Sequence, residues 1–434
     1  MAPRPFHLAW FCTFRPPVWT SPYGEVDGRT WPTGDFHVDM ARSLERACFD
    51  YIMMEDSTLV SDTFGGTMEN DLQYSIHAPK HDPLVLAPLM AQATSRLGVV
   101  VTMSTSFYHP YLVARSMSTL DHLTRGRIGW NIVTSSEDVA AQNYGMDRLP
   151  EHDERYDRAD EFVEIVTELW DSWDDDALVM DRAERRYVDH NKVRTIDYVG
   201  KYLKCRGPLN TLRGPQGRPV ICQAGGSPRG RAFAAQHADI ILAAPLGVEA
   251  MKAYRDEIQG LAEDHGRPPG SCKVMFLVSP ILGATEEEAA EKRAEIYSGS
   301  DERVADRLAH LAVICSIDWT KYDWDEPIPD DLTTNGHQSV LDNFRRHANG
   351  RTIREAAADS RVQAVELVGT SESVADQMAA VMDEVGGDGF LFTGELSREY
   401  IRQVTDGLVP ALQRRGVVRT SYAAEKFRDN VLSF

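Results

Sequence analysis

Cysteine pairs, a basic surface and long apolar runs are all missing from this 434-residue chain. Its six cysteines stand apart without a Cys-x-x-Cys pair, which favours buried free thiols over a disulfide framework or a zinc site. The 66 acidic residues outnumber the 46 Lys and Arg, giving a formal charge of −20. This excess argues against binding to nucleic acid or to an anionic membrane surface, because both need a cationic face.

Neither a targeting segment nor a membrane span is predicted. The first 11 residues lack the basic stretch and apolar run of a secretory signal. No window approaches the roughly 18 uninterrupted apolar residues of a transmembrane helix. We therefore expect a cytoplasmic protein.

Short apolar runs recur along the chain and alternate with segments of helical periodicity. In residues 35–49, Met40, Leu44 and Ala47 fall on one helical face. Eight such runs favour a single α/β domain, a (β/α)8 TIM barrel, over a doubly wound open sheet, because no Gly-x-Gly-x-x-Gly turn follows the first run. The predicted strands are Phe6–Phe11, Tyr51–Met54, Gly98–Met103, Arg127–Val133, Pro219–Gln223, Asp239–Ala243, Lys273–Ser279 and Gly389–Thr393.

Long insertions are expected within this domain of residues 1–434, because such a barrel averages about 250 residues. The candidates are residues 55–82, 172–218 and 295–365, which are rich in Pro, Gly, Asp or Asn and weakly periodic. Active sites of such barrels form at the C-terminal ends of the strands. We expect the insertions to lie over that face.

Polar groups follow four of the predicted strands at the ends where chemistry is expected. Most are neutral hydroxyls or glycines, an inventory that suits hydrogen bonding to a large polar heteroaromatic with a sugar-like chain better than it suits a metal. The four groups are Glu55-Asp56-Ser57, Ser104-Thr105-Ser106, Thr134-Ser135-Ser136 and Gly225-Gly226-Ser227.

The segment VICQAGGSPRGRAFAAQHAD gives the sharpest local signal. Ser227 is a favoured N-cap, Pro228 suits the first helical position, and the glycines before them permit close backbone approach. A helix that begins after such a turn is either an ordinary capped helix or a phosphate site, to which Arg229 and Arg231 would add positive charge.

His152 and Tyr156 stand four residues apart at a predicted helix start, so both side chains lie on one face. They can reach a phosphate or ribityl oxygen, or pack as ordinary surface and core residues. His77 and His81 are separated by Pro79, which spoils a helical metal pair. A metal-dependent hydrolase barrel is therefore disfavoured, and no metal site is predicted.

Four ordered segments resemble the nitrilotriacetate monooxygenase family of bacterial-luciferase-like enzymes, which also includes dibenzothiophene sulfone, dimethyl sulfide and long-chain alkane monooxygenases. They are TLDHLTRGRIGWNIVTS, EHDERYDRADEFVE, RGPLNTLRGPQGRPVICQAG and LVPALQRRGVVRTSY, within a match from about Phe6 to Val431. The resemblance implies a luciferase-like barrel that uses O2 and reduced FMN (FMNH2), through a flavin peroxide. It also implies a separate NAD(P)H:flavin reductase that delivers FMNH2, and cleavage of a C–N, C–S or C–halogen bond or hydroxylation of the substrate.

The resemblance further implies which residues contact the flavin. Those at the ends of the second, third and fourth strands would lie beside the flavin ring, whereas the helix start and the glycine turn would hold its phosphate. The first group comprises Asp56, Thr102, Ser104, Asn131, Ser135 and Ser136, and the second comprises His152, Tyr156, Ala224, Gly225, Gly226 and Ser227.

Two histidines are candidate catalytic acids. By resemblance to the alkane monooxygenase, His310 in RLAHLAVICSIDWTKY lies on the substrate side of the flavin, where it would donate a proton or a hydrogen bond. The alternative is a helix histidine packed under a lid formed by residues 295–365. His109, after the third strand, is the second candidate.

Two other functions use the same barrel: a deazaflavin-dependent dehydrogenase, and a flavin-binding protein without turnover. Oxygen consumption with reduced FMN and a tolerated substrate, compared with reduction of a deazaflavin by an alcohol, separates the monooxygenase from the dehydrogenase. The flavin-binding protein would bind FMN without forming a substrate-dependent product. Proteins resembling this one associate, which implies a homodimer or a dimer of dimers. The tail Arg414–Phe434 suits packing against a neighbouring copy or against its own barrel.

Overall fold

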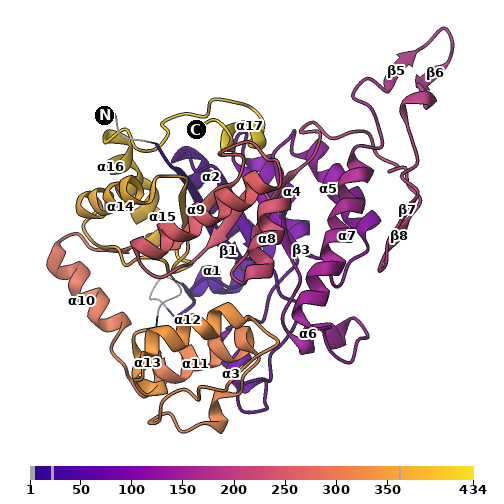
Figure 1. The fold of residues 1–434 in the computed structure, drawn as a ribbon. Coiled ribbons are helices and arrows are strands. Elements are labelled where there is room, and N and C mark those ends of the chain that lie inside the picture. The colour runs from indigo at the N-terminus through magenta and orange to yellow at the C-terminus, as the bar shows by residue number, and fades with distance from the viewer. Residues whose placement is uncertain (1–4, 21–23, 361–362) are drawn as a thin grey trace.

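The computed structural model describes residues 5–20, 24–360 and 363–434, so predictions that include residues 1–4, 21–23 or 361–362 lie outside it at those positions. Eight parallel strands close into a barrel in the order β1-β2-β3-β4-β9-β10-β11-β14, which confirms the predicted fold (Figure 1). Each strand begins and ends within two residues of its prediction. The strands are β1 (His7–Thr13), β2 (Tyr51–Glu55), β3 (Gly98–Ser104), β4 (Ile128–Val133), β9 (Val220–Ala224), β10 (Ile240–Ala243), β11 (Lys273–Val278) and β14 (Gly389–Phe392).

Helices follow the barrel strands and cover the outside of the barrel. Along each strand, alternate side chains point inward or toward the helices. Met53 and Val100 belong to the inner cluster, whereas Ile52 and Val101 belong to the outer one. The covering helices are α2 (Asp35–Arg46), α4 (Pro83–Ala93), α5 (Pro110–Leu123), α7 (His152–Trp170), α8 (Pro228–His237), α9 (Val248–Asp264), α14 (Ser371–Val385), α15 (Arg398–Arg402) and α16 (Val409–Arg414), the last two joined by a π-helical turn, Gln403–Leu408.

The C-terminal tail closes the N-terminal end of the barrel. Helix α17 (Phe427–Val431) places Phe427 against the Tyr51 ring, with centroids 5.4 Å apart. A Cβ on Gly98 would lie 2.5 Å from the Phe427 ring, so this approach requires glycine. Of the two uses left open for the tail, the structure therefore shows packing on its own barrel.

Two insertions lie over the expected face of the barrel. Residues 55–82 contain α3 (Glu69–Tyr74), and residues 295–365 contain α11 (Asp301–Cys315), α12 (Gln338–Ala348) and α13 (Ile353–Ala358). These helices lie at the end of the barrel away from the chain termini (Figure 1). The larger insertion is more regular than its weak periodicity predicted, because Trp319, Phe344 and Ile353 give it a separate hydrophobic core.

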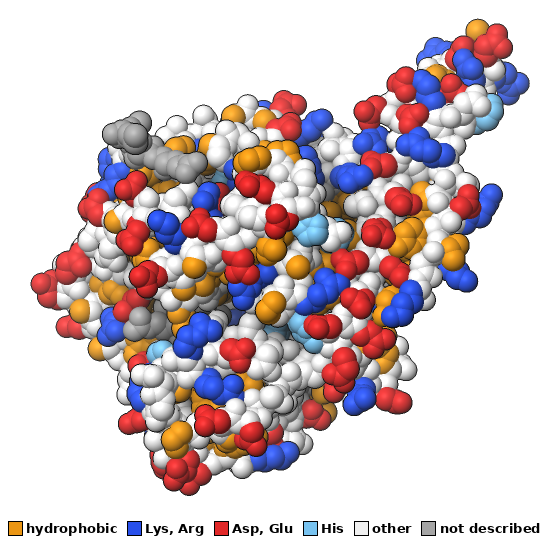
Figure 2. Space-filling view, viewed as in Figure 1, with side chains coloured by type: hydrophobic (Ala, Val, Ile, Leu, Met, Phe, Trp, Pro, Cys, Tyr) orange, Lys and Arg blue, Asp and Glu red, His pale blue; other side chains and the backbone are white. Residues whose placement is uncertain are grey.

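The third insertion, residues 172–218, lies elsewhere than predicted. It joins the end of α7 to the start of β9, and therefore leaves the barrel at the N-terminal ends of the strands. Its first hairpin, β5 (Leu178–Asp181) and β6 (Arg186–Val188), projects from the body with acidic, basic and apolar side chains intermixed (Figures 1 and 2). Its second, β7 (Tyr198–Val199) and β8 (Lys204–Cys205), lies beside α7, where Tyr198 donates to Glu164 at 2.6 Å.

The remaining short helices are α1 (Glu25–Thr30), α6 (Asp138–Asn143) and α10 (Glu286–Ile296), and β12 (Ile281–Leu282) pairs with β13 (Val368–Gly369). All six cysteines are free thiols, and all except the half-buried Cys48 are buried. Within the described ranges, no helix has the length and apolar character needed to cross a membrane.

Candidate active site

The ends of β3 and β4 bring four predicted residues together. Thr102 donates to the Met54 carbonyl at 2.8 Å and accepts from the Asn131 amide at 2.9 Å. The hydroxyls of Ser104 and Ser135 share a hydrogen bond of 2.8 Å. Asn131 is 4% exposed, and its Oδ1 has no hydrogen-bond partner among the described residues. A buried acceptor of this kind costs free energy unless a ligand satisfies it.

The turn after β4 contains a residue with a strained backbone conformation. Ser135 adopts a φ of 60°, a left-handed conformation that is uncommon for a side chain other than Gly or Asn. Ser136 donates to Glu137, and its carbonyl accepts from Ser316 of the large insertion at 3.3 Å. The end of β4 therefore meets the insertion directly.

The glycine turn after β9 has the predicted local structure. Ser227 caps α8 by accepting from the Gly230 amide at 3.0 Å, and Pro228 is the first helical residue. A Cβ on Gly225 would lie 2.8 Å from the Gly230 carbonyl oxygen, so this position also requires glycine. Ala224, at the end of β9, and Gly226 are both exposed beside the turn.

Helix α7 brings His152 and Tyr156 to the same turn. The Ser227 hydroxyl lies 3.2 Å from His152 Nε2, and the rings of His152 and Tyr156 lie 5.0 Å apart. Gln223, which the sequence did not single out, donates to the Tyr156 hydroxyl at 3.3 Å, and its own Oε1 is unpartnered among the described residues. These contacts confirm the shared face of His152 and Tyr156.

The two arginines after Ser227 do not supply free positive charge. Arg229 forms an ion pair with Asp157 at 3.0 Å and another with Asp160, whereas Arg231 pairs with Glu257. The prediction that they strengthen an anion site is wrong, because neighbouring helices neutralise them. Amides, the Tyr156 hydroxyl and His152 are the donors that remain.

Asp56 follows β2 beside the Glu55–Lys80 ion pair, whose N···O distance is 2.8 Å. Burial, and then the negative charge of Glu55, raise the pKa of Asp56 to about 7, against the opposing charge of Lys80. Asp56 therefore changes its charge near neutral pH, unlike an exposed carboxyl.

The large insertion covers the turn and the end of β4. Arg155, which is 3% exposed, donates to the Asn335 side chain at 3.2 Å and to its carbonyl at 3.1 Å. A Cβ on Gly226 would lie 2.4 Å from the Ser339 hydroxyl, so the start of α12 lies directly on the glycine turn. Burial lowers the pKa of His337, which lies in the same segment. These contacts join segments that are far apart in the sequence, so no local sequence pattern predicted them.

His310 lies on α11, and its ring stacks on that of His77 with centroids 5.3 Å apart. Burial lowers the pKa of His310 to about 3, with further lowering by the charges of His77, Arg15 and Lys80. His310 is therefore a neutral imidazole at physiological pH. His109 lies apart from this group, because it is exposed and caps α5 by accepting from the Tyr111 amide at 3.2 Å.

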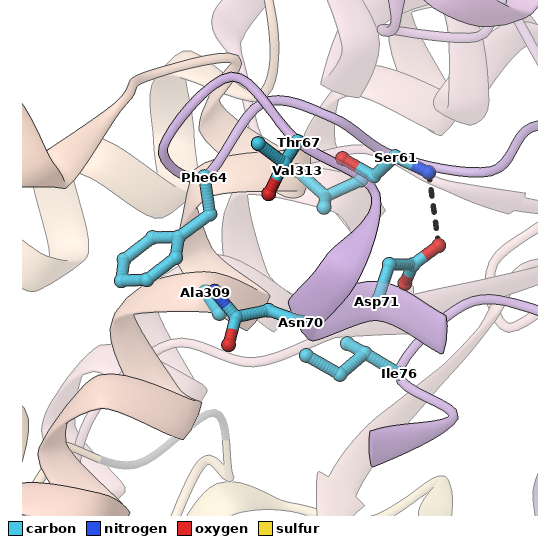
Figure 3. Close-up of a pocket in the computed structure, with 8 residues that line it drawn as sticks. All are labelled: Ser61, Phe64, Thr67, Asn70, Asp71, Ile76, Ala309 and Val313. Atoms are coloured by element: carbon cyan, nitrogen blue, oxygen red, sulfur yellow. Dashed lines mark hydrogen bonds between the residues drawn. The ribbon is translucent and has the colours of Figure 1, made fainter. Parts of the chain in front are cut away.

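A small cavity lies where the insertion after β2 meets α11 (Figure 3). Phe64, Ile76 and Val313 give it an apolar wall, and Thr67 and Asn70 add polar groups. Asp71 accepts from the Ser61 amide at 2.9 Å at its edge. The remaining lining residue is Ala309, next to His310 in sequence.

Comparison with known proteins identifies the family to which the chain is similar. The sequence model described as luciferase-like monooxygenase matches residues 6–389. The chain is 36% identical to the dibenzothiophene-sulfone monooxygenase of Rhodococcus erythropolis, with 92% of this chain and 90% of that protein aligned. It is 34% identical to nitrilotriacetate monooxygenase component A of Aminobacter aminovorans, over 91% and 89%.

Solved structures agree with these relatives. A riboflavin lyase crystallised with modified FMN and riboflavin is 31% identical and has a TM-score of 0.89, covering 99% of this chain and 96% of that one. The long-chain alkane monooxygenase has a TM-score of 0.87 at 32% identity, covering 99% and 95%. The expected family and an oxidoreductase activity are thereby confirmed: the chain belongs to the luciferase-like monooxygenases.

Proposed function

We propose that this chain is the cytoplasmic oxygenating component of a two-component enzyme. A separate NAD(P)H:flavin reductase would supply FMNH2, and O2 would supply one oxygen atom to a small organic substrate. Relatives named as parts of larger systems support this division. They are the nitrilotriacetate component A and pristinamycin IIA synthase subunits A and B of Streptomyces pristinaespiralis, which are 34% and 29% identical to this chain.

The residues at the mouth fit FMN. The unpartnered Oδ1 of Asn131 carries the assignment, because it is a buried acceptor at the end of β4 that a flavin N–H or ribityl hydroxyl would satisfy. Thr102, Ser104, Ser135 and Asp56 would complete the ring and ribityl contacts.

The phosphate would lie at the start of α8. Gly225 and Gly226 allow close approach of the backbone. Ser227 shares a hydrogen bond with His152, whose ring lies 5.0 Å from that of Tyr156. A helix N-terminus favours a phosphate through its free amides and dipole. The ion pairs of Arg229 and Arg231 leave those amides as the main donors.

Reduced FMN, when bound, would supply the electrons that activate O2. The protein's own part is to position the substrate, exclude water and handle protons. The Arg155–Asn335 and Ser136–Ser316 contacts hold the large insertion over the mouth, as water exclusion requires. His310 would donate a hydrogen bond as a neutral N–H on the substrate side. The product step would break a C–N, C–S or C–halogen bond, or hydroxylate the substrate.

The alternatives have weaker support. Deazaflavin (F420)-dependent dehydrogenase and reductase structures share only the fold, at 14% and 15% identity. A flavin-binding protein without turnover does not fit a chain whose full-length relatives are named as monooxygenases.

The test combines binding with turnover. Titration of the full chain with FMN should give saturable binding, and a generic flavin reductase with NADH should then support O2 consumption. Substrates should be screened among tertiary amines, organosulfur compounds and chlorinated aromatics, with product formation as the readout. Absence of FMN binding, or reduction of a deazaflavin by an alcohol in place of O2 consumption, would contradict the proposal.

Assembly as a homodimer or a dimer of dimers is part of the proposal. The β5–β6 hairpin supports it, because Met180 and Tyr187 are 59% and 61% exposed on an arm that projects from the body. Light scattering should show a mass that is a multiple of 48.6 kDa. Replacing residues 178–188 with a Gly-Ser linker should lower that mass, and a wild-type monomer at micromolar concentration would count against association.

A further inference from the structure

Four basic side chains converge where the two insertions meet, above the ends of β1 and β2. Arg15 follows β1 by two residues, His77 and Lys80 belong to the insertion after β2, and His310 lies on α11. Arg15 Nη1 donates to the Ile76 carbonyl at 2.8 Å, which fixes the guanidinium beside His77. The imidazoles of His77 and His310 stack, with an interplanar angle of 10°.

The counter-charges of this cluster are unevenly distributed. Lys80 is paired with Glu55 and also donates to Ser57 at 2.6 Å. His77 Nδ1 lies 3.2 Å from an Asp71 oxygen, which also accepts from the His77 amide. Both of these side chains therefore have a carboxylate partner within the protein.

Arg15 differs from them. Among the described residues, no carboxylate lies within ion-pair distance of its guanidinium, which donates to the neutral carbonyl of Ile76. Asp306, on α11 one turn before His310, lies close enough to interact electrostatically with Arg15. Burial nevertheless raises the pKa of Asp306, against the charges of Arg307, Arg303 and Arg15. The guanidinium of the half-buried Arg15 therefore has no ion pair within the described residues that would compete with a bound anion.

Arg15 is linked to the small cavity of Figure 3 through Ile76, whose carbonyl accepts from Arg15 and which also lines the cavity. Ala309, another lining residue, precedes His310 in sequence. Burial is the main cause of the low pKa of His310, and the charges of Arg15 and Lys80 lower it further. A planar oxyanion matches the forked donors of a guanidinium.

We propose that the substrate carries an oxyanion, a carboxylate or a sulfonate, which pairs with Arg15 beside the stacked His77 and His310. This inference rests on the proposed function, because it takes the barrel mouth as the reaction site. The oxyanion holds the substrate at the insertion side, and its reacting group extends toward the strand ends. Neutral substrates of similar shape lack this contact and bind more weakly.

The experiment measures binding to the full chain without turnover. Phenylacetate, phenylmethanesulfonate and the neutral phenylacetamide are titrated by calorimetry at low ionic strength, since salt screens the contact. Both anions should bind at least tenfold more tightly than the amide. Stronger binding of phenylacetate assigns a carboxylate, and stronger binding of phenylmethanesulfonate assigns a sulfonate. Equal binding of the amide, or no binding of either anion, would overturn the proposal.

Variants locate the contact. Arg15→Gln should weaken both anions at least tenfold, whereas Arg15→Lys, which keeps the charge but loses the fork, should weaken them only a few-fold. Arg115→Gln removes an exposed arginine of α5 and should change nothing. Unchanged anion binding in Arg15→Gln would overturn the assignment. FMN affinity, measured in parallel, should be the same in all variants, so failure of the proposed function would appear as lost FMN binding by the wild type.

Discussion

The proposed flavin side and the proposed substrate side of the barrel mouth, called here the flavin side and the substrate side, are built differently. The flavin side, at the ends of β3, β4 and β9, consists of hydroxyls, amides and glycines that follow directly from the strands. The substrate side, around Arg15 and His310, consists of charged and imidazole groups from segments far apart in the chain. A cofactor site can therefore be part of the barrel itself. Substrate specificity can then depend on the insertions, which can differ between proteins without disturbing the barrel.

The largest effect should come from His310 on the substrate side. His310→Ala should lower turnover by about 10²–10³-fold, as expected for loss of a positioned hydrogen-bond donor, because a neutral His310 has no proton to transfer as an acid. FMN affinity should not change, and the fraction of O2 released as hydrogen peroxide should rise. Stopped-flow kinetics measures turnover, and a peroxide assay measures the released hydrogen peroxide.

His265→Ala, at an exposed position at the end of α9, is the matched control, and His109→Ala tests the second candidate. Because burial and nearby cations hold the pKa of His310 at about 3, turnover should show no inflection from this group between pH 5 and 8. If His310→Ala keeps wild-type turnover and releases no more hydrogen peroxide than the wild type, His310 has no catalytic role and catalysis belongs to the flavin side alone.

The local structure of the proposed flavin side was largely predictable from sequence, because its signals are local. Ser227 followed by Pro228 predicts a capped helix, and the spacing of His152 and Tyr156 predicts one helical face; both features are found. The polar residues after each strand meet because parallel strands end at one rim. These structural expectations required only periodicity and turn chemistry.

The substrate side was not predictable in this way. Arg15, Lys80 and Asn335 have no motif, and their environment depends on how two insertions fold against each other. Residues 172–218 show the same limit, since composition indicates an insertion but chain order decides from which end of the barrel it leaves. The charge of Arg229 likewise depended on partners in another helix.

The next effect concerns the phosphate on the flavin side. FMN should bind at least tenfold more tightly than riboflavin, since a charge-assisted hydrogen bond contributes about 1.5–3 kcal/mol. Ser227→Ala and Tyr156→Phe should each raise the FMN dissociation constant and reduce the difference between the two flavins. Fluorescence titration measures both constants.

Ser300→Ala provides the control for this comparison, because Ser300 caps α11 in the same way at a distance from the turn. It should leave both dissociation constants unchanged. Equal affinity of the wild type for FMN and riboflavin would contradict the proposed phosphate site at the start of α8.

A smaller effect should follow from loosening the contact between the two sides. Asn335→Ala removes the acceptor of the Arg155 side-chain hydrogen bond, worth about 0.5–1.5 kcal/mol, but leaves the bond to the Asn335 carbonyl. Peroxide release should rise about two- to tenfold, with little change in FMN affinity. Asn191→Ala on the exposed arm is the control, and unchanged peroxide release in Asn335→Ala would show that this contact does not exclude water.

The smallest effect is a pH dependence at Asp56, where the two sides meet. Its pKa rises from 3.8 to about 7 on folding, through burial and the charge of Glu55, against Lys80 and with a smaller contribution from Asp82. Between these two values the folded protein holds a proton that the unfolded chain has lost. The free energy of unfolding must therefore fall as pH rises through this window, and level off above pH 7. Solvent screening of a partly exposed carboxyl should limit the change to about 1 kcal/mol.

Urea unfolding of the wild type and Asp56→Asn from pH 5 to 8 measures this change in the free energy of unfolding. The Asp56→Asn variant should lose this part of the pH dependence, whereas Asp62→Asn, at an exposed position, should retain it. Parallel slopes for the wild type and Asp56→Asn would mean that Asp56 is ionised throughout, and the strand ends would then hold a fixed negative charge beside the proposed flavin site.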